Sequence, residues 1–190
     1  MKRRIAILIS GRGSNMLALA RNCGGGLLNA EVFFVACDNP EAPGLADAEK
    51  LGLKTHLLPY AALGKYKAEE HLDRLISDSR AEWLILAGFM RVLSPGFVLR
   101  RRGRIVNIHP SLLPAFPGKD SIRRAFDHGV MVTGVTVHLV DEQVDHGKIL
   151  AQEPVRIFPG EPIEDLEERI HQAEQILYTR TLIHLLDPSR

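Results

Sequence analysis

The stretch RIAILIS (residues 4–10), followed directly by GRGSN (residues 11–15), decides the fold class of this chain. The first part is a continuous apolar run, and the second is a glycine-rich turn that ends it. Such a pair predicts a strand buried on both faces within a parallel sheet. A helix should follow the turn, with Ser14 or Asn15 near its amino-terminal cap, because short polar side chains accept hydrogen bonds from free helical N–H groups.

The same alternation of apolar strands and helices returns along the chain. Further strands are predicted at residues 31–37, 55–58, 83–87 and 104–109, and helices at residues 43–51 and 67–79. This order predicts an α/β fold with a doubly wound, mostly parallel, Rossmann-like sheet. Two later runs, residues 133–140 and 149–157, are separated only by a loop, which indicates antiparallel additions at one edge. A closing helix is predicted at residues 162–186, so that residues 1–190 form a single domain.

Length and charge limit the class of protein. At 190 residues with 45% hydrophobic content, the chain can bury one sizeable core. Its 24 Lys and Arg residues nearly balance 23 Asp and Glu residues, so no global field would recruit nucleic acid or an anionic membrane. No stretch approaches the length of a membrane span, and Cys23 and Cys37 form no CxxC motif. We therefore expect a cytoplasmic protein whose partners are small molecules.

The glycine-rich turn is the first candidate site. Free N–H groups and the positive end of the helix dipole collect anions at such a place, so Gly13, Ser14 and Asn15 are candidates for holding a phosphate monoester. The turn lacks the GK[ST] of a Walker A loop and the third glycine of a dinucleotide fingerprint. The alternative is a tight turn that only caps the helix.

The second candidate is Asn107-Ile108-His109-Pro110, at the carboxyl end of a predicted strand, where open α/β sheets bind ligands. Strand side chains alternate, so Asn107 and His109 share one face while Ile108 enters the other. An amide can stabilise a carbonyl oxygen that becomes an oxyanion, and a histidine can move a proton near neutral pH. The alternative is a histidine whose hydrogen bonds a neighbouring loop satisfies.

The charged loop at residues 141–147 is the third candidate. A carboxylate from this loop could reach His109 and stabilise its imidazolium, although an acidic hairpin loop is often only solvated. His109, His138, Asp145 and His146 match no zinc spacing, so no metal ion is expected. The arginines at residues 100–104 are expected to be a solvated surface rather than a nucleic-acid contact.

Four blocks together are similar to one family. ISGRGSN (9–15), LAGFMRVLSP (86–95), NIHPSLLPAFPG (107–118) and VTVHLVDEQVDHGKILAQ (135–152) resemble, in matching order, the folate-dependent formyltransferases. The SGRGSN start is similar to the branch of that family that acts on glycinamide ribonucleotide. The resemblance implies transfer of a formyl group from 10-formyltetrahydrofolate, the co-substrate, to the amine of that nucleotide, a step of purine synthesis.

The resemblance also implies roles for individual residues. His109 matches the family's catalytic histidine, Asp145 the acid that supports it, and Asn107 the group at the formyl-bearing end of the folate. The substrate phosphate would lie at Gly13, Ser14 and Asn15, in an amino-terminal half of about residues 1–100. A carboxyl-terminal half, about residues 101–190, would carry the folate and catalytic groups. Near the substrate, Glu174 matches an acidic family position, whereas a family glutamine is replaced by His171. Met90, Arg91, Val92, Leu93 and Asp141 match positions that border the folate, and a family arginine that contacts it has no sure match, with Lys65 or Lys67 as its replacement.

Several alternatives stay open. The same NIHPS region is similar to that of a deformylase, which hydrolyses the folate but carries an extra amino-terminal domain, whereas here a core strand is predicted almost at once. A tRNA formyltransferase would need an additional carboxyl-terminal domain. A non-catalytic phosphate binder would use only the turn at Gly13. The family pattern is not kept at Lys119-Asp120-Ser121-Ile122. As to assembly, we expect a monomer or a homodimer.

Overall fold

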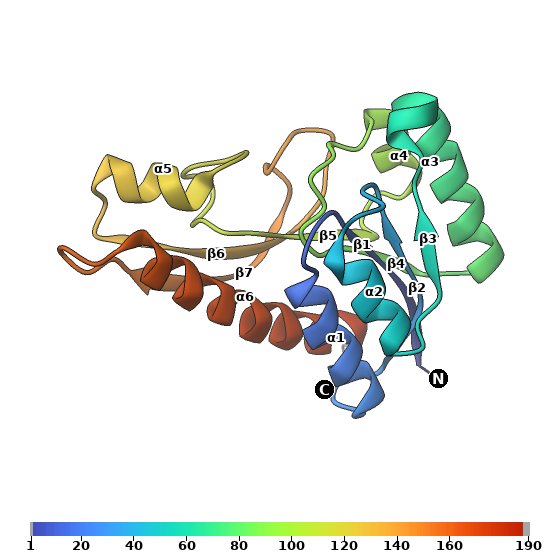
Figure 1. Cartoon of the computed structure of the whole chain (residues 1–190), viewed down its shortest axis with the longest axis horizontal. Helices are drawn as coiled ribbons and strands as arrows, with labels where there is room; N and C mark the ends of the chain where they lie inside the picture. The colour runs from blue at the N-terminus through green and yellow to red at the C-terminus, as the bar shows by residue number, and fades with distance from the viewer. Residues whose placement is uncertain (1, 188–190) are drawn as a thin grey trace.

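A single seven-stranded sheet organises the part of the chain that the computed structural model describes, residues 2–187 (Figure 1). The strands are β1 (Arg3–Ile9), β2 (Ala30–Cys37), β3 (Thr55–Leu57), β4 (Trp83–Leu86), β5 (Ile105–His109), β6 (Val132–Leu139) and β7 (Ile149–Arg156). Their order in the sheet is β3-β2-β1-β4-β5-β6-β7. The first five are parallel, whereas β6 pairs antiparallel with both β5 and β7. The predicted doubly wound sheet with antiparallel edge additions is confirmed.

Six helices connect and cover these strands. They are α1 (Ser14–Gly24), α2 (Pro43–Lys50), α3 (Tyr60–Ser79), α4 (Pro95–Arg100), α5 (Ser121–His128) and α6 (Ile163–Leu186). Apolar side chains of α1, α2 and α6 pack on one face of the sheet, and those of α3 and α4 pack on the other. The parallel strands are therefore covered on both faces, which explains why their sequences are continuous apolar runs.

Strand alternation divides the core of β1 into two parts. Ile5, Ile7 and Ile9 enter the cluster under α1 and α6, whereas Ala6 and Leu8 enter the cluster under α3 and α4. All five are fully buried. Each large aliphatic side chain buried in this way contributes roughly 1.5–3 kcal/mol of transfer free energy, so the first strand alone anchors both layers.

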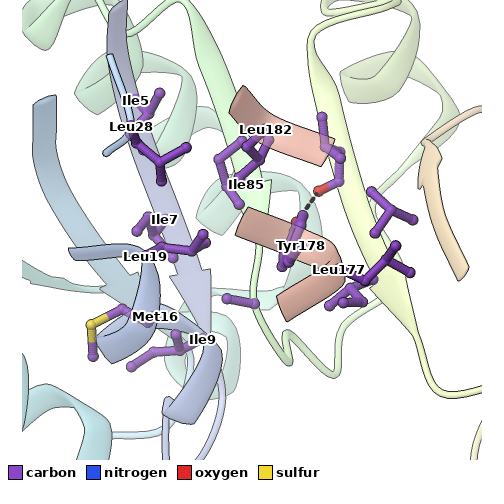
Figure 2. Packing of buried hydrophobic residues seen from close by; sticks show 14 of the residues in the cluster. Ile5, Ile7, Ile9, Met16, Leu19, Leu28, Ile85, Leu177, Tyr178 and Leu182 are labelled. Carbon is purple, nitrogen blue, oxygen red and sulfur yellow. Dashed lines mark hydrogen bonds between the residues drawn. The ribbon is translucent and has the colours of Figure 1, made fainter. Parts of the chain in front are cut away.

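Tyr178 joins the closing helix to the middle of the sheet. Figure 2 shows its ring among Ile85, Leu177 and Leu182. Its hydroxyl lies 3.0 Å from the carbonyl oxygen of Leu86, the last residue of β4, and 3.0 Å from that of Val106 in β5. The helix therefore contacts the two strands whose carboxyl ends form the site described below.

Three helical segments differ from the expectation. The helix expected at residues 67–79 begins already at Tyr60 and is kinked at Gly64, whose φ of 74° is left-handed. The short helices α4 and α5 were not predicted, because loops dominate the sequence around them. The hydroxyl of Ser94 accepts a hydrogen bond from the amide of Phe97 at 3.3 Å and caps α4.

Candidate active site

A cavity of about 280 Å³ opens at the carboxyl edge of the parallel strands. Asn107 and His109 from the end of β5 lie on one side of it, the irregular segment after β4 on another, and the loop at residues 140–145 on a third. Its lining is mostly apolar and contains Leu86, Phe89, Met90, Val92, Leu93, Val98 and Val140. Because a few polar groups converge in an otherwise apolar pocket, this is the strongest candidate for a ligand site.

His109 lies between two hydrogen-bond acceptors. Its Nδ1 is 3.3 Å from Oδ2 of Asp145, and its Nε2 is 3.0 Å from the carbonyl oxygen of Phe116. The side chains of His109 and Asp145 are only 7% and 11% exposed, so water screens the pair little. A neutral imidazole can donate to one of these acceptors, whereas the imidazolium donates to both. The two acceptors therefore fix the orientation of the ring.

Asp145 connects two loops that border the cavity. Its φ of 51° is left-handed, a conformation that costs a non-glycine residue roughly 1–2 kcal/mol. The carboxylate also accepts a hydrogen bond from the amide of Gly118 at 2.8 Å. This bond and the contact with His109 fix the loop after β6 against the loop after β5, which explains how the strained backbone persists.

His138 is a neighbour that the sequence suggested only as a possible metal ligand. It stands directly opposite Asn107 in the antiparallel pairing of β5 and β6. Its Nδ1 lies 3.0 Å from the carbonyl oxygen of Leu139 and so carries the hydrogen, which leaves Nε2 to accept from Nδ2 of Asn107 at 3.1 Å. Burial lowers the pKa of His138, against the opposing effects of the Leu139 carbonyl and Asp145. A neutral His138 thus orients the amide of Asn107.

The amide of Asn107 has a partner for each of its two hydrogens. Its Nδ2 donates to Nε2 of His138 at 3.1 Å and makes a long hydrogen bond of 3.5 Å to Oδ1 of Asp145, so a ligand oxygen would take the place of the weaker of the two. Asn107 and His109 therefore present an amide donor and an imidazole on the same side of β5, as the alternation predicts. The register between β5 and β6 identifies His138 as the neighbour of Asn107, but the sequence alone does not show which residues of the two strands are paired.

Most of the residues expected to bind the folate line the cavity, whereas the two lysines lie in α3. Met90, Arg91, Val92, Leu93 and Asp141 line the cavity with Asn107. Lys65 and Lys67 lie in α3 and are not part of this lining. The cavity combines residues before and after residue 100, so both halves expected from the sequence contribute to it.

The glycine-rich turn lies outside the cavity lining. Gly13 is the residue before α1, with a left-handed φ of 71°, and no side chain caps this helix end. Ser14 and Asn15 therefore lie next to the cap, as expected, but neither side chain caps the helix. Gly44 approaches the turn closely, since its amide donates to the carbonyl of Gly11 at 3.1 Å.

Asn15 is committed to Glu174 instead of to the helix end. Its Nδ2 donates to Oε2 of Glu174 at 3.2 Å, and both residues are buried. Burial raises the pKa of Glu174 to about 7, against the lowering effect of the Asn15 hydrogen bond. The structure thus brings two of the expected substrate residues together from opposite ends of the chain, whereas His171 lies exposed on the same helix as Glu174.

Two further sequence expectations concern the surface. The arginines before β5 are engaged with other side chains: Arg100 and Arg101 pair with Asp73 at 2.6 and 2.8 Å, and Arg104 lies over the ring of Trp83. Within residues 2–187, no helix is both long enough and apolar enough to cross a membrane. Over the same residues, no cluster of three or more His, Cys, Asp or Glu side chains is arranged to hold a metal ion.

The chain is similar in sequence to proteins of known family. A family model described as formyl transferase matches residues 3–182. The chain is 37% identical to phosphoribosylglycinamide formyltransferase of Escherichia coli (strain K12), over 92% of this chain and 82% of that protein. It is 38% identical to the trifunctional purine biosynthetic protein adenosine-3 of Gallus gallus, over 95% of this chain. It spans only 18% of the length of that trifunctional relative.

Solved structures share the fold. The crystal structure of glycinamide ribonucleotide transformylase 1 from Geobacillus kaustophilus matches with a TM-score of 0.94 and 43% identity, over 98% of this chain and all of that one. A formyltetrahydrofolate deformylase from Pseudomonas syringae pv. tomato matches with a TM-score of 0.91 and 25% identity, over 99% of this chain and 62% of that one. The structural match alone therefore does not separate transfer from hydrolysis.

Proposed function

The chain belongs to the formyl transferase family, and from this membership we propose that it transfers the formyl group of 10-formyltetrahydrofolate to the amine of glycinamide ribonucleotide. This is a step of purine biosynthesis. The resemblance expected from the four sequence blocks is confirmed at the level of the family. The names of the relatives from Escherichia coli and Geobacillus kaustophilus support the transferase over other members.

One observation carries the proposal. His109, with an acceptor at each ring nitrogen, stands beside the oriented amide of Asn107 at the floor of an apolar cavity. A formyl group placed there would have its carbonyl oxygen next to two hydrogen-bond donors. Both side chains are held in place before the reaction, so only their acceptors would change when the oxyanion develops, and positioned donors of this kind stabilise such a charge.

The reaction begins when the neutral amine of the nucleotide attacks the formyl carbon. A new C–N bond forms, and the carbonyl electron pair becomes an oxyanion that Asn107 and protonated His109 stabilise. Asp145 keeps the imidazolium in place through its Nδ1 hydrogen. The carbonyl of Phe116 holds the Nε2 hydrogen until a substrate oxygen replaces it.

Collapse of the tetrahedral intermediate completes the transfer. The attacking nitrogen gives up a proton, which reaches N10 of the folate through water, and the bond between the formyl carbon and N10 breaks. Tetrahydrofolate and the formylated nucleotide leave. No metal ion takes part in these proposed reaction steps.

Two other regions would hold the substrates. The backbone N–H groups at Gly13 and Ser14, at the start of α1, suit a phosphate, and Glu174 with His171 would face the sugar. Met90, Arg91, Val92 and Leu93 would border the pterin from one side and Asp141 from the other. The mostly apolar walls fit a flat heterocycle whose polar edge meets backbone groups. The protein would act in the cytoplasm as a monomer or a homodimer, with small molecules as its partners.

The two-substrate assay tests the proposal against the deformylase. The full chain is incubated with glycinamide ribonucleotide, with 10-formyltetrahydrofolate, and with both together. We expect tetrahydrofolate only when both are present, together with an equal amount of formylated nucleotide. Formate released from the folate alone would instead assign a hydrolase, and no turnover with either combination would leave only a phosphate binder.

A further inference from the structure

The wall of the cavity after β4 has no regular secondary structure of its own. Residues 88–94 are neither helical nor extended in a strand. Met90 and Val92 line the cavity, and they are 61% and 58% exposed. Such a segment cannot hold a fixed shape through a backbone ladder, so other groups must anchor it. Phe89 and Leu93 are buried and supply the apolar anchors.

The polar anchors come from the ends of two neighbouring strands. Ser10 follows β1 and Asp38 follows β2, at the same edge of the sheet as the cavity. The amide of Met90 donates to the hydroxyl of Ser10 at 2.8 Å, and that hydroxyl donates to Oδ1 of Asp38 at 2.5 Å. The other oxygen, Oδ2, accepts from Nε of Arg91 at 2.5 Å.

Asp38 therefore holds two successive residues of the segment, Met90 through the Ser10 hydroxyl and Arg91 directly. Its side chain is 6% exposed, whereas that of Arg91 is 49% exposed. A buried carboxylate that accepts two charge-assisted or short hydrogen bonds contributes more free energy than a surface ion pair, because water competes little for its oxygens. The Tyr60 ring, 5.5 Å from the Arg91 guanidinium, restricts the arginine further.

We propose that Asp38 and Ser10 are positioning residues for the formylfolate: they fix Met90 and Arg91, and thereby set the affinity of the cavity wall for this co-substrate. Neither side chain is part of the cavity lining, so both act through the residues that they hold. The inference rests on the proposed function, since it takes the cavity as the folate site. It identifies residues that determine co-substrate affinity without being catalytic residues.

Kinetics of the full chain test this inference. In Asp38→Asn the side chain keeps one acceptor oxygen and loses the charge, and in Ser10→Ala the relay to Met90 is cut. We expect KM for 10-formyltetrahydrofolate to rise on the order of tenfold in both, with kcat within about threefold and KM for the nucleotide unchanged. Ser10→Thr restores the hydroxyl and should recover much of the loss.

Glu82→Gln is the matched control. Glu82 also pairs with an arginine, at 2.7 Å from Arg3, and it accepts a hydrogen bond from the amide of Arg4 at 3.2 Å. It directly precedes β4, at the amino ends of the parallel strands and away from the cavity. The Glu82→Gln variant should therefore keep both KM values of the wild type. An unchanged folate KM in Asp38→Asn and Ser10→Ala, or an equal rise for both substrates, would overturn the inference.

Hydrogen exchange distinguishes this inference from the proposed function. In Asp38→Asn we expect faster amide exchange confined to residues 88–94, which Glu82→Gln should not show. If wild-type protein forms no tetrahydrofolate in the two-substrate assay, the proposed function fails while exchange still reports on the anchor. If exchange in residues 88–94 stays at the wild-type rate, the anchor itself is refuted, whatever the activity.

Discussion

Oδ2 of Asp145 lies 3.3 Å from Nδ1 of His109, and the same oxygen accepts the amide hydrogen of Gly118 at 2.8 Å. The carboxylate thus joins the imidazole at the end of β5 to the loop that follows it. A single left-handed residue after β6 turns the carboxylate into this position. The contact connects the fold to the chemistry, because the antiparallel pairing of β5 with β6 sets His138 opposite Asn107, so the loop that follows Leu139 begins beside the site.

Asp145→Asn keeps the size of the side chain and an oxygen for the Gly118 amide, but it removes the negative charge beside His109. We expect kcat to fall on the order of a hundredfold, because the imidazolium loses its partner. Asp127→Asn on α5, which removes an exposed carboxylate 3.9 Å from Arg123, is the control and should keep wild-type kcat. Steady-state kinetics of both variants compare them, and equal rates would remove Asp145 from the reaction.

Asn107→Ala removes the amide that His138 orients. By analogy with oxyanion-hole donors, we expect the barrier to rise by about 3 kcal/mol, roughly a hundredfold or more in rate. The single-turnover rate with both substrates bound measures this step without the binding steps. A near-normal rate would show that the oxyanion is stabilised elsewhere.

Most of the fold could be predicted because buried parallel strands have an unmistakable pattern. RIAILIS and WLILA are apolar without interruption, and both are central strands. The short helices α4 and α5 escaped prediction, since loops dominate the sequence around them. The start of α3 was missed because Gly64 interrupts its pattern at the kink.

The candidate site was only partly accessible from the sequence. Alternation along β5 was sufficient to place Asn107 and His109 together, because it is a local property. The partnership of Asn15 with Glu174, and of Asn107 with His138, depends on contacts between distant elements, which the pattern of one element does not encode. For that reason the sequence places Asn15 near the start of the helix but does not reveal that its amide donates to a buried carboxyl.

The raised pKa of Glu174 predicts a dependence of stability on pH. Its pKa rises from 4.5 to about 7 on folding, so the protonated form is favoured in the folded protein. Its contribution to stability is fully present below pH 4.5 and is lost as the pH rises through 7. Between these limits we expect a loss of about 3 kcal/mol relative to Glu174→Gln, which stays neutral.

Urea unfolding of wild type and Glu174→Gln at pH 4.5 and pH 8 measures this difference. All other titrating groups are common to both proteins, so they cancel when the two free energies of unfolding are subtracted. A constant difference across this range would contradict the assignment of a raised pKa to Glu174.

Gly44→Ala tests the phosphate turn. A Cβ atom at Gly44 would lie 2.8 Å from the carbonyl oxygen of Gly11, so the turn must shift. We expect KM for the nucleotide to rise on the order of tenfold, with KM for the folate unchanged, because the displaced N–H groups no longer meet the phosphate. Gly24→Ala, where a Cβ atom meets nothing within 4 Å, is the control. A rise in the folate KM alone would place the phosphate elsewhere.

His109→Ala is the most direct test of the central claim, that an imidazolium held between Asp145 and the Phe116 carbonyl drives formyl transfer. The measurement is the single-turnover rate of tetrahydrofolate formation, together with the Kd for glycinamide ribonucleotide from calorimetry. The account predicts a rate lower by roughly a thousandfold, with nucleotide affinity close to that of the wild type. Transfer that continues at the wild-type rate without His109 would contradict it.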